Sequence, residues 1–375
     1  EPRAFAPRVP TPPMATYEGT WAYRDRFHEG FARTYFRPFG DFALSSVGVG
    51  TYLGDPTDET DEQYHEAIVS ALESGVNVLD TAINYRCQRS ERVVGEAIAD
   101  SETQRDEVFV ATKGGFLPFD GSRPDDPGRY LHEEFVASGL ADRDDLAMGQ
   151  HCIAPGYIDD QLDRSLDNLE LDSVDLYYVH NPETQLEERS REAVYDQLEA
   201  TFEVLERRAS DGDLGAYGVA TWEAFRVPQS HDSYLSLPEV LARAEQAAET
   251  VGTDESHFQA VQLPFNVYMA DAFTTRSHDT PEGPKSVLEV AHEADLHVFT
   301  SASLMQGKLA EEMPERVAAE LAGDTRAQRA INFARSAPGV TCALVGMGSP
   351  EHVEENVAAG THEPLGAGAF DAIFE

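Results

Sequence analysis

Short apolar runs alternate with segments of helical spacing along most of this chain, and that alternation limits the folds it can adopt. The predicted strands cover residues 43–50, 76–80, 108–112, 174–179, 216–220, 259–263, 296–301 and 341–345. The predicted helices cover residues 60–74, 90–99, 158–169, 191–209, 236–248, 285–294, 325–336 and 350–358. Strict alternation favours parallel strands, and eight repeats favour a single closed (β/α)8 barrel of the TIM type. An open doubly wound sheet is the alternative, but no GxGxxG motif follows an early strand.

Three successive predicted strands deliver ionisable side chains at their carboxyl ends. The first ends on Asp80 and is followed by Tyr85, the next delivers Lys113, and the third delivers His180. The carboxyl ends of parallel strands meet at the edge of a barrel where ligands bind. These four residues are therefore the candidate catalytic residues.

Lys113 carries the strongest argument, because the chain contains only three lysines, Lys113, Lys285 and Lys308. Asp80 on the neighbouring strand is expected to pair with it. A phenol has a pKa near 10, so Tyr85 needs a cation to lower that value if it is to exchange protons near neutral pH, and Lys113 is the available cation. A structural ion pair is the alternative to a catalytic role.

The predicted organisation is an N-terminal arm and barrel cap at residues 1–40, a barrel at 41–358 and a C-terminal tail at 359–375. Residues 1–20 are expected to form a flexible arm, and residues 21–40 a helix or hairpin that covers one end of the barrel. Residues 115–157 form a polar insertion after the third strand. An insertion of this length is typical of a functional lid or rim, and it begins at the edge that carries Lys113.

Acidic residues outnumber basic ones by 68 to 28, giving a net charge of −40. With so few lysines, this resembles the surface of a halophilic protein from a high-salt cytoplasm, where counterions screen the self-repulsion. Such a surface argues against nucleic acid or membrane partners. The amino terminus lacks the apolar core of a signal peptide, and no apolar run has the roughly 18 residues of a membrane span, so a cytoplasmic protein is expected.

No metal site is predicted. Cys87, Cys152 and Cys342 are far apart, without CxxC spacing, and no HExxH motif occurs. His151 and the other scattered histidines are expected to be surface or structural residues.

Several motifs resemble those of the aldo-keto reductases. The first is GVNVLDTA at residues 75–82, followed by Tyr85, Glu91 and Gly95. The others are KGG at residues 113–115, Val179-His180, GKL at residues 307–309 and VGMGSPEHVEEN at residues 345–356. The resemblance extends from about residue 46 to residue 356. It implies a (β/α)8 barrel that binds NADP(H) or NAD(H) and reduces an aldehyde or ketone to an alcohol, or the reverse.

The resemblance also implies residue roles. Tyr85 matches the general acid, Lys113 and Asp80 the pair that tunes it, and His180 the residue that orients the carbonyl. Gln262 matches a residue that contacts the nicotinamide amide, and Glu355 and Asn356 match adenine contacts. The full set of implied cofactor-binding residues is Gly50, Thr51, Tyr52, Ala220, Thr221, Gln262, Ser301, Leu304, Gly307, Lys308, Gly346, Gly348, His352, Glu355 and Asn356.

The chain departs from the family pattern at three places. Ala220 and Thr221 stand where a serine and an asparagine are usual, and Ser301 stands where a tyrosine stacks on nicotinamide. Gly346 and His352 replace the basic residues that hold the 2′-phosphate, which makes use of NADH as well as, or instead of, NADPH plausible.

The substrate is not readable from the sequence. Aromatic residues that follow strand ends are candidates for an apolar pocket or for packing: Phe116, Trp222, Phe265 and Tyr268. Two rival functions stay open. One is a cofactor-binding regulatory subunit with little turnover, and the other is an unrelated barrel lyase or isomerase that uses Lys113 as a Schiff base.

Overall fold

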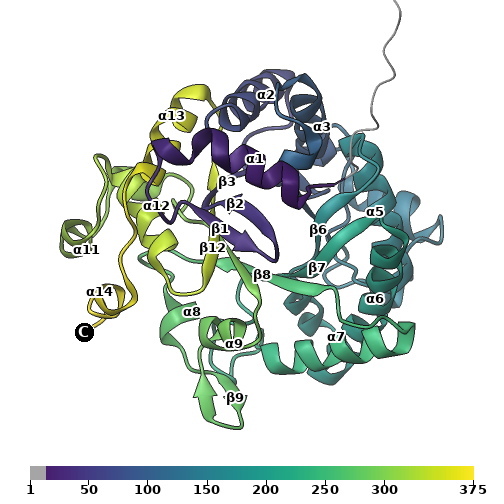
Figure 1. Cartoon of the computed structure of the whole chain (residues 1–375). Helices are drawn as coiled ribbons and strands as arrows, with labels where there is room; N and C mark the ends of the chain where they lie inside the picture. The colour runs from purple at the N-terminus through teal and green to yellow at the C-terminus, as the bar shows by residue number, and fades with distance from the viewer. Residues whose placement is uncertain (1–13) are drawn as a thin grey trace, which may run out of the picture.

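A closed barrel of eight parallel strands forms the centre of the molecule (Figure 1). The computed structural model describes residues 14–375. Around the barrel the strand order is β11-β12-β3-β4-β5-β6-β7-β8. The strands are β3 Val47–Gly50, β4 Val78–Asp80, β5 Phe109–Gly114, β6 Val174–His180, β7 Leu214–Ala220, β8 Phe258–Pro264, β11 His297–Ser301 and β12 Val340–Gly346. The predicted (β/α)8 barrel is confirmed, and the open sheet is excluded because β8 pairs with β11 and β12 pairs with β3.

An outer ring of helices surrounds the barrel, as apolar residues at helical spacing require. These helices are α2 Asp58–Leu72, α3 Arg89–Asp100, α5 Pro155–Leu169, α6 Arg191–Asp211, α7 Leu237–Val251, α9 Val287–Glu293, α12 Arg326–Ser336 and α13 Pro350–Ala358. Thr57, Ser190 and Ser349 accept a backbone hydrogen bond at the starts of α2, α6 and α13. Such caps satisfy amide groups that have no partner within the helix.

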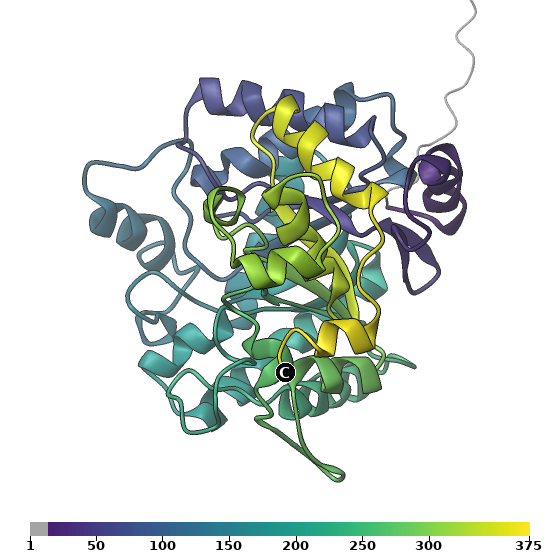
Figure 2. The ribbon, with the colours of Figure 1, turned by 90° about the vertical axis from the view of Figure 1, so that its left-hand side faces the viewer.

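The first described segment closes one end of the barrel. Helix α1 Tyr17–Phe27 leads into an antiparallel hairpin of β1 Phe36–Phe39 and β2 Phe42–Ser45. Phe39 packs inside the barrel mouth, with its ring centroid 4.7 Å from that of Phe109. In Figure 2 this segment and the blue-teal insertion lie at opposite ends of the molecule. The hairpin therefore leaves the carboxyl ends of the strands free for a site.

Two boundaries differ from the sequence expectation. The single strand predicted at residues 43–50 is two strands, β2 and β3, that separate at Ser46. The backbone N–H of Ser45 donates to Asn77 Oδ1, and its hydroxyl donates to the carbonyl of Val47. These local bonds form a turn, so one strand does not run through residues 43–50. The flexible arm expected at residues 1–20 is helical from Tyr17, with Thr16 as its cap. The rest of that expected arm, residues 1–13, lies outside the described residues.

The insertion and the C-terminal segment contain short elements. The insertion has α4 Pro127–Leu131, the π-helical turn η4 His132–Val136 and the 3-10 turn η5 Arg143–Asp145. Further additions are α8 Asp271–Thr274, the hairpin of β9 His278–Thr280 and β10 Gly283–Lys285, α10 Lys308–Glu311 and α11 Glu315–Glu320. The chain closes with α14 Ala367–Asp371. Phe370 of α14 is fully buried, so residues 359–375 pack against the barrel.

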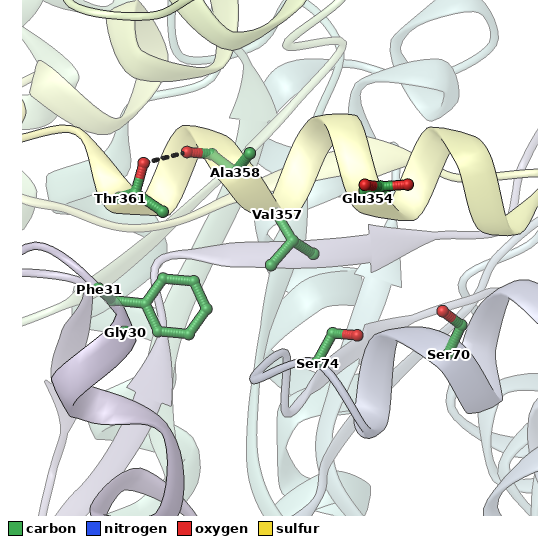
Figure 3. A pocket seen from close by; sticks show the side chains of 8 residues that line it. All are labelled: Gly30, Phe31, Ser70, Ser74, Glu354, Val357, Ala358 and Thr361. Atoms are coloured by element: carbon green, nitrogen blue, oxygen red, sulfur yellow. Dashed lines mark hydrogen bonds between the residues drawn. The ribbon is translucent and has the colours of Figure 1, made fainter.

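A surface pocket of about 300 Å³ lies between α2 and α13 (Figure 3). Ser70, Ser74, Val357 and Phe31 are among its lining residues. Phe31 belongs to the segment that precedes the hairpin, so the pocket lies toward the closed end of the barrel. It is separate from the strand ends that carry the candidate catalytic residues.

Basic side chains on the surface are surrounded by several acids each. Arg243 forms ion pairs with four carboxylates, those of Glu192, Asp196, Glu199 and Glu239. Lys285 pairs with Glu282 and Glu293. The remaining acidic excess has no local counter-charge and repels itself.

We therefore expect the melting temperature to rise with salt, because screening weakens the net repulsion of a chain with charge −40. Circular dichroism melts in sodium chloride, from tens of millimolar to molar, measure this. The ion pairs above are screened too, but carboxylates outnumber them. An unchanged melting temperature across that range would contradict the expectation.

The described part of the chain, residues 14–375, contains neither a membrane-spanning helix nor a cluster of metal-ligating side chains. No helix there is long and apolar enough to cross a membrane. No group of three or more His, Cys, Asp or Glu side chains in this part of the chain is arranged to hold a metal ion.

Candidate active site

Lys113 and Asp80 form a buried ion pair at the carboxyl end of the barrel. Lys113, which is 0% exposed, places Nζ 2.6 Å from Asp80 Oδ1 and 2.8 Å from the carbonyl oxygen of Thr81. Gln262 Nε2, from β8 on the opposite side of the barrel, donates to Asp80 Oδ2 at 2.7 Å. Burial lowers the pKa of Lys113 and raises the pKa of Asp80, and the attraction between them opposes both shifts.

Tyr85 lies directly beside this pair. Strand β4 ends at Asp80, and the chain then enters the 3-10 turn η2 Tyr85–Gln88, which brings the phenol back over the strand ends. The centroid of its ring is 5.0 Å from Lys113 Nζ, 5.1 Å from the ring of Tyr52 and 5.9 Å from the ring of His180. The expected convergence of the catalytic side chains is thus present in the geometry.

The expected electrostatics of Tyr85 differ from those in the structure. Burial raises the pKa of Tyr85 well above its ordinary value, and the negative charge of Asp80 raises it further. Contrary to the sequence expectation, the charge of Lys113 does not outweigh these two effects, because its ammonium bonds to Asp80 and to a backbone carbonyl and lies 5.0 Å from the ring centroid. The phenol is therefore protonated at neutral pH and can donate a proton.

The backbone after Tyr85 has a strained conformation, and an ion pair of Arg86 holds it in place. Arg86, Cys87 and Gln88 all have positive φ, at 49°, 59° and 69°, which is costly for residues with a Cβ. The buried Arg86 side chain bonds to the carbonyl of Asp55 and forms an ion pair with Asp61 at the start of α2. These contacts hold the turn that carries Tyr85. The role of Arg86 in holding this turn was not predicted from the sequence, because no glycine marks the turn.

His180 is the last residue of β6, and its ring lies in the same cluster. Phe116 contacts it edge-on with ring centroids 5.2 Å apart. Its Nδ1 atom is buried and has no hydrogen-bond partner among residues 14–375. Burial lowers the pKa of His180 well below its ordinary value, and the charge of Lys113 adds to the effect. The imidazole is neutral at physiological pH.

The residues implied for cofactor binding come from the other side of the barrel. They lie at or just after the ends of β7, β8, β11, β12 and β3, in the loop that leads to α10, at the start of α10, and in α13. These five strands form a continuous arc in the strand order. The strand register places Gly346 of β12 beside Gly50 of β3, and Gly50 beside Asp80 of β4. Thr51 bonds to the carbonyl of Asp80, and Thr221 bonds to that of Gln262. The candidate catalytic residues come from β4, β5, β6 and the turn after β4, which complete the circle of strands.

This arc has the properties that a long nucleotide requires. A Cβ atom added at Gly307 or Gly348 would meet nothing within 4 Å, so a ligand can approach the backbone there. Lys308, Gly346 and His352 are exposed. Gln262, expected to contact the nicotinamide amide, gives its amide N–H to Asp80 in this structure. Leu304, Ser301 and Glu355 are half-buried, and Asn356 and Ala220 are buried.

Three of the four aromatic candidates for a substrate pocket lie at the rim. Phe116 is half-buried against His180, and Trp222 and Tyr268 are 47% and 56% exposed. Phe265 takes the packing alternative, since it is 0% exposed and packs against Phe333 and Phe370 in the core. Its position after a strand end was right, but its side chain points away from the rim.

The fold and the site define a barrel whose catalytic end carries a Tyr–Lys–Asp–His cluster. A model of the aldo/keto reductase family matches residues 46–374. The chain belongs to this family of oxidoreductases.

Individual relatives are distant. An uncharacterized oxidoreductase, YqkF, of Bacillus subtilis is 28% identical over 48% of this chain and 46% of its own length. The NADH-specific methylglyoxal reductase of Escherichia coli is 28% identical over 49% of this chain and 50% of its length. The alignments to these two curated relatives thus span about half of each. A putative voltage-gated potassium channel subunit beta of Schizosaccharomyces pombe is 24% identical over 84% of both chains.

Solved structures share the fold. The holo form of aldo-keto reductase AKR11C1 from Bacillus halodurans superposes with a TM-score of 0.60 at 21% identity, covering 90% of this chain and 95% of that one. An aldo/keto reductase from Klebsiella pneumoniae in complex with NADP and acetate gives 0.58 at 20% identity, with 90% and 94% covered.

Proposed function

We propose that this protein is an NAD(P)H-dependent carbonyl reductase that converts an aldehyde or ketone to an alcohol, or catalyses the reverse. The observation that carries the proposal is the buried Lys113–Asp80 pair with the Tyr85 ring and the neutral His180 imidazole beside it. A protonated phenol, a buried cation and a neutral imidazole at one point are suited to accept charge that develops on a carbonyl oxygen.

Each residue has a defined part in the proposed reaction. The bound nicotinamide supplies a hydride to the carbonyl carbon. Tyr85 gives its phenolic proton to the oxygen, where the electron pair of the C=O π bond arrives. Lys113, 5.0 Å from the ring centroid, stabilises the tyrosinate that remains. His180 is positioned to donate a hydrogen bond that orients the carbonyl.

The cofactor would lie along the arc from β7 to β3, with its adenosine end at α13. That end carries His352 without an arginine or lysine at the matched positions, and the neighbouring Glu351 and Glu354 are exposed. Their negative charge opposes a 2′-phosphate. We infer that NADH binds at least as tightly as NADPH.

Introducing a cation at α13 is expected to reverse this preference. His352→Arg should strengthen NADPH binding by roughly tenfold to a hundredfold, because a charge-assisted hydrogen bond to phosphate contributes about 1.5–3 kcal/mol. NADH affinity should hold. Fluorescence titration measures both. His28→Arg adds the same charge at the exposed closed end of the barrel and serves as control. Equal strengthening by the two variants would show a nonspecific field effect and contradict the placement.

A second candidate function is that of a cofactor-binding regulatory subunit. The observation that favours it is the fission yeast relative, named as a putative potassium channel beta subunit, which aligns over 84% of this chain. The two functions differ in turnover. The test is consumption of reduced nicotinamide with nitrobenzaldehyde or methylglyoxal in molar salt. Tight cofactor binding without turnover on a panel of carbonyls would favour the regulatory function.

A further inference from the structure

His151, which comes from the insertion, holds the backbone of His180. Its Nε2 atom lies 2.8 Å from the carbonyl oxygen of His180, and the ring is 0% exposed. Strand β5 ends at Gly114, and Asn181 turns away with φ at 48°. The carbonyl of His180 therefore emerges just past the barrel ladder, where a buried acceptor needs a partner. His151 supplies that partner.

Gln185 sets which nitrogen of His151 carries the proton. Its Nε2 atom lies 2.9 Å from His151 Nδ1 and 3.0 Å from the His151 carbonyl oxygen. An amide nitrogen only donates, so Nδ1 must accept and Nε2 must carry the hydrogen. Burial lowers the pKa of His151 to about 4, so the ring stays neutral at physiological pH. Both ring nitrogens are thus satisfied by one tautomer.

The surrounding contacts leave little freedom at this point. A Cβ atom on Gly115 would lie 2.6 Å from the His180 carbonyl oxygen and 3.1 Å from His151 Nε2. The Phe116 ring packs against both histidines, with its centroid 4.8 Å from that of His151 and 5.2 Å from that of His180. A short bridge pairs Phe116 with His151. Both ends of the insertion therefore meet at the backbone of His180.

We propose that His151 is a positioning residue for His180, and that Gln185 and the insertion of residues 115–157 act through it. The insertion is then a working part of the active site as well as its rim. This inference rests on the proposed function, in which His180 orients the carbonyl. Loss of the His151 donor should let the His180 backbone shift, and misplacement of about 1 Å can cost roughly a hundredfold in rate.

The test compares two buried histidines with the same local bonding. His278 is also 0% exposed, with Nε2 2.8 Å from the carbonyl oxygen of Phe225, but that pair is not part of the catalytic cluster. We expect His151→Leu to lower kcat roughly tenfold or more while cofactor affinity holds. His151→Gln, whose amide can replace the Nε2–H donor, should recover most of kcat. His278→Leu should lower the melting temperature without lowering kcat.

Other outcomes would overturn the inference. These are an unchanged kcat in His151→Leu, a loss in His278→Leu as large as in His151→Leu, or no recovery in His151→Gln. If His151→Leu does not fold, Gln185→Met provides the test. It keeps the His151 ring but removes the hydrogen bond that fixes the tautomer of that ring. It should lower kcat, and an unchanged kcat would refute the role. If the wild type lacks turnover, the proposed function fails, but the positioning role of His151 can still be tested by NMR of the His180 ring in the cofactor complex. The His180 signals should shift in His151→Leu and should not shift in His278→Leu.

Discussion

Replacing Tyr85 with phenylalanine is expected to lower kcat by at least about a hundredfold, the usual scale of general acid catalysis. The substitution removes one hydroxyl and keeps the ring that packs against Tyr52 and His180. Fold and cofactor affinity should therefore survive. The measurement is kcat for nitrobenzaldehyde, with cofactor binding followed in parallel by fluorescence.

Tyr195→Phe is the matched control, because it removes the hydroxyl of another buried tyrosine, on α6 and away from the candidate active site. It should keep most of the activity. Because the pKa of Tyr85 is raised, the phenol stays protonated at and above neutral pH, so ionisation of Tyr85 should limit wild-type reduction only at strongly alkaline pH. A Tyr85→Phe enzyme that binds cofactor and keeps more than about a tenth of kcat would show that Tyr85 is not the acid.

Lys113→Met should remove activity and also destabilise the fold. It leaves the Asp80 carboxylate buried with Gln262 as its remaining side-chain donor among the described residues. Breaking a buried pair in this way costs about 3–5 kcal/mol. Burial then raises the pKa of Asp80 further, so the folded state takes up a proton more readily than the unfolded state. The stability deficit against wild type should shrink as the pH falls through that raised pKa.

The double variant Asp80→Asn/Lys113→Met separates stability from catalysis. With both charges removed, no uncompensated charge stays buried, so the melting temperature should recover toward that of the wild type. Turnover should not recover, because the cation beside the Tyr85 ring is still missing. Chemical denaturation and kcat of the three variants give both quantities. Recovery of turnover in the double variant would mean that Lys113 has only a structural role.

The barrel and the Lys113–Asp80 contact could be predicted because both follow from periodicity and position. Strand ends of parallel neighbours must lie at one edge, and a lysine at the end of an apolar run must find a counter-charge there. The division at Ser46 was not predicted: Ser45 and Ser46 interrupt the apolar residues there, but two serines alone do not distinguish a turn from a continuous strand. The choice between pocket and packing for Phe265 could not be made, because position after a strand end does not say which way the side chain points.

The electrostatics of the site and the role of His151 could not be predicted from the sequence. The pKa of Tyr85 depends on burial and on where Lys113 Nζ points, and neither is encoded in spacing. His151 was expected to be a surface or structural residue because it has no partner at metal-ligand spacing. Its contact with His180 joins a polar insertion to a strand end, 29 residues apart, so only the three-dimensional fold brings them together.

The central claim, hydride transfer from nicotinamide to a carbonyl, is tested most directly by an isotope. The enzyme is supplied with NADH or NADPH carrying deuterium at both C4 positions, together with nitrobenzaldehyde in molar salt, and the alcohol is analysed by NMR. The account predicts one deuterium on the carbinol carbon of the product, and no such product from Tyr85→Phe at matched time. An alcohol without deuterium, or a borohydride-trapped adduct on Lys113 in place of the alcohol, would contradict it.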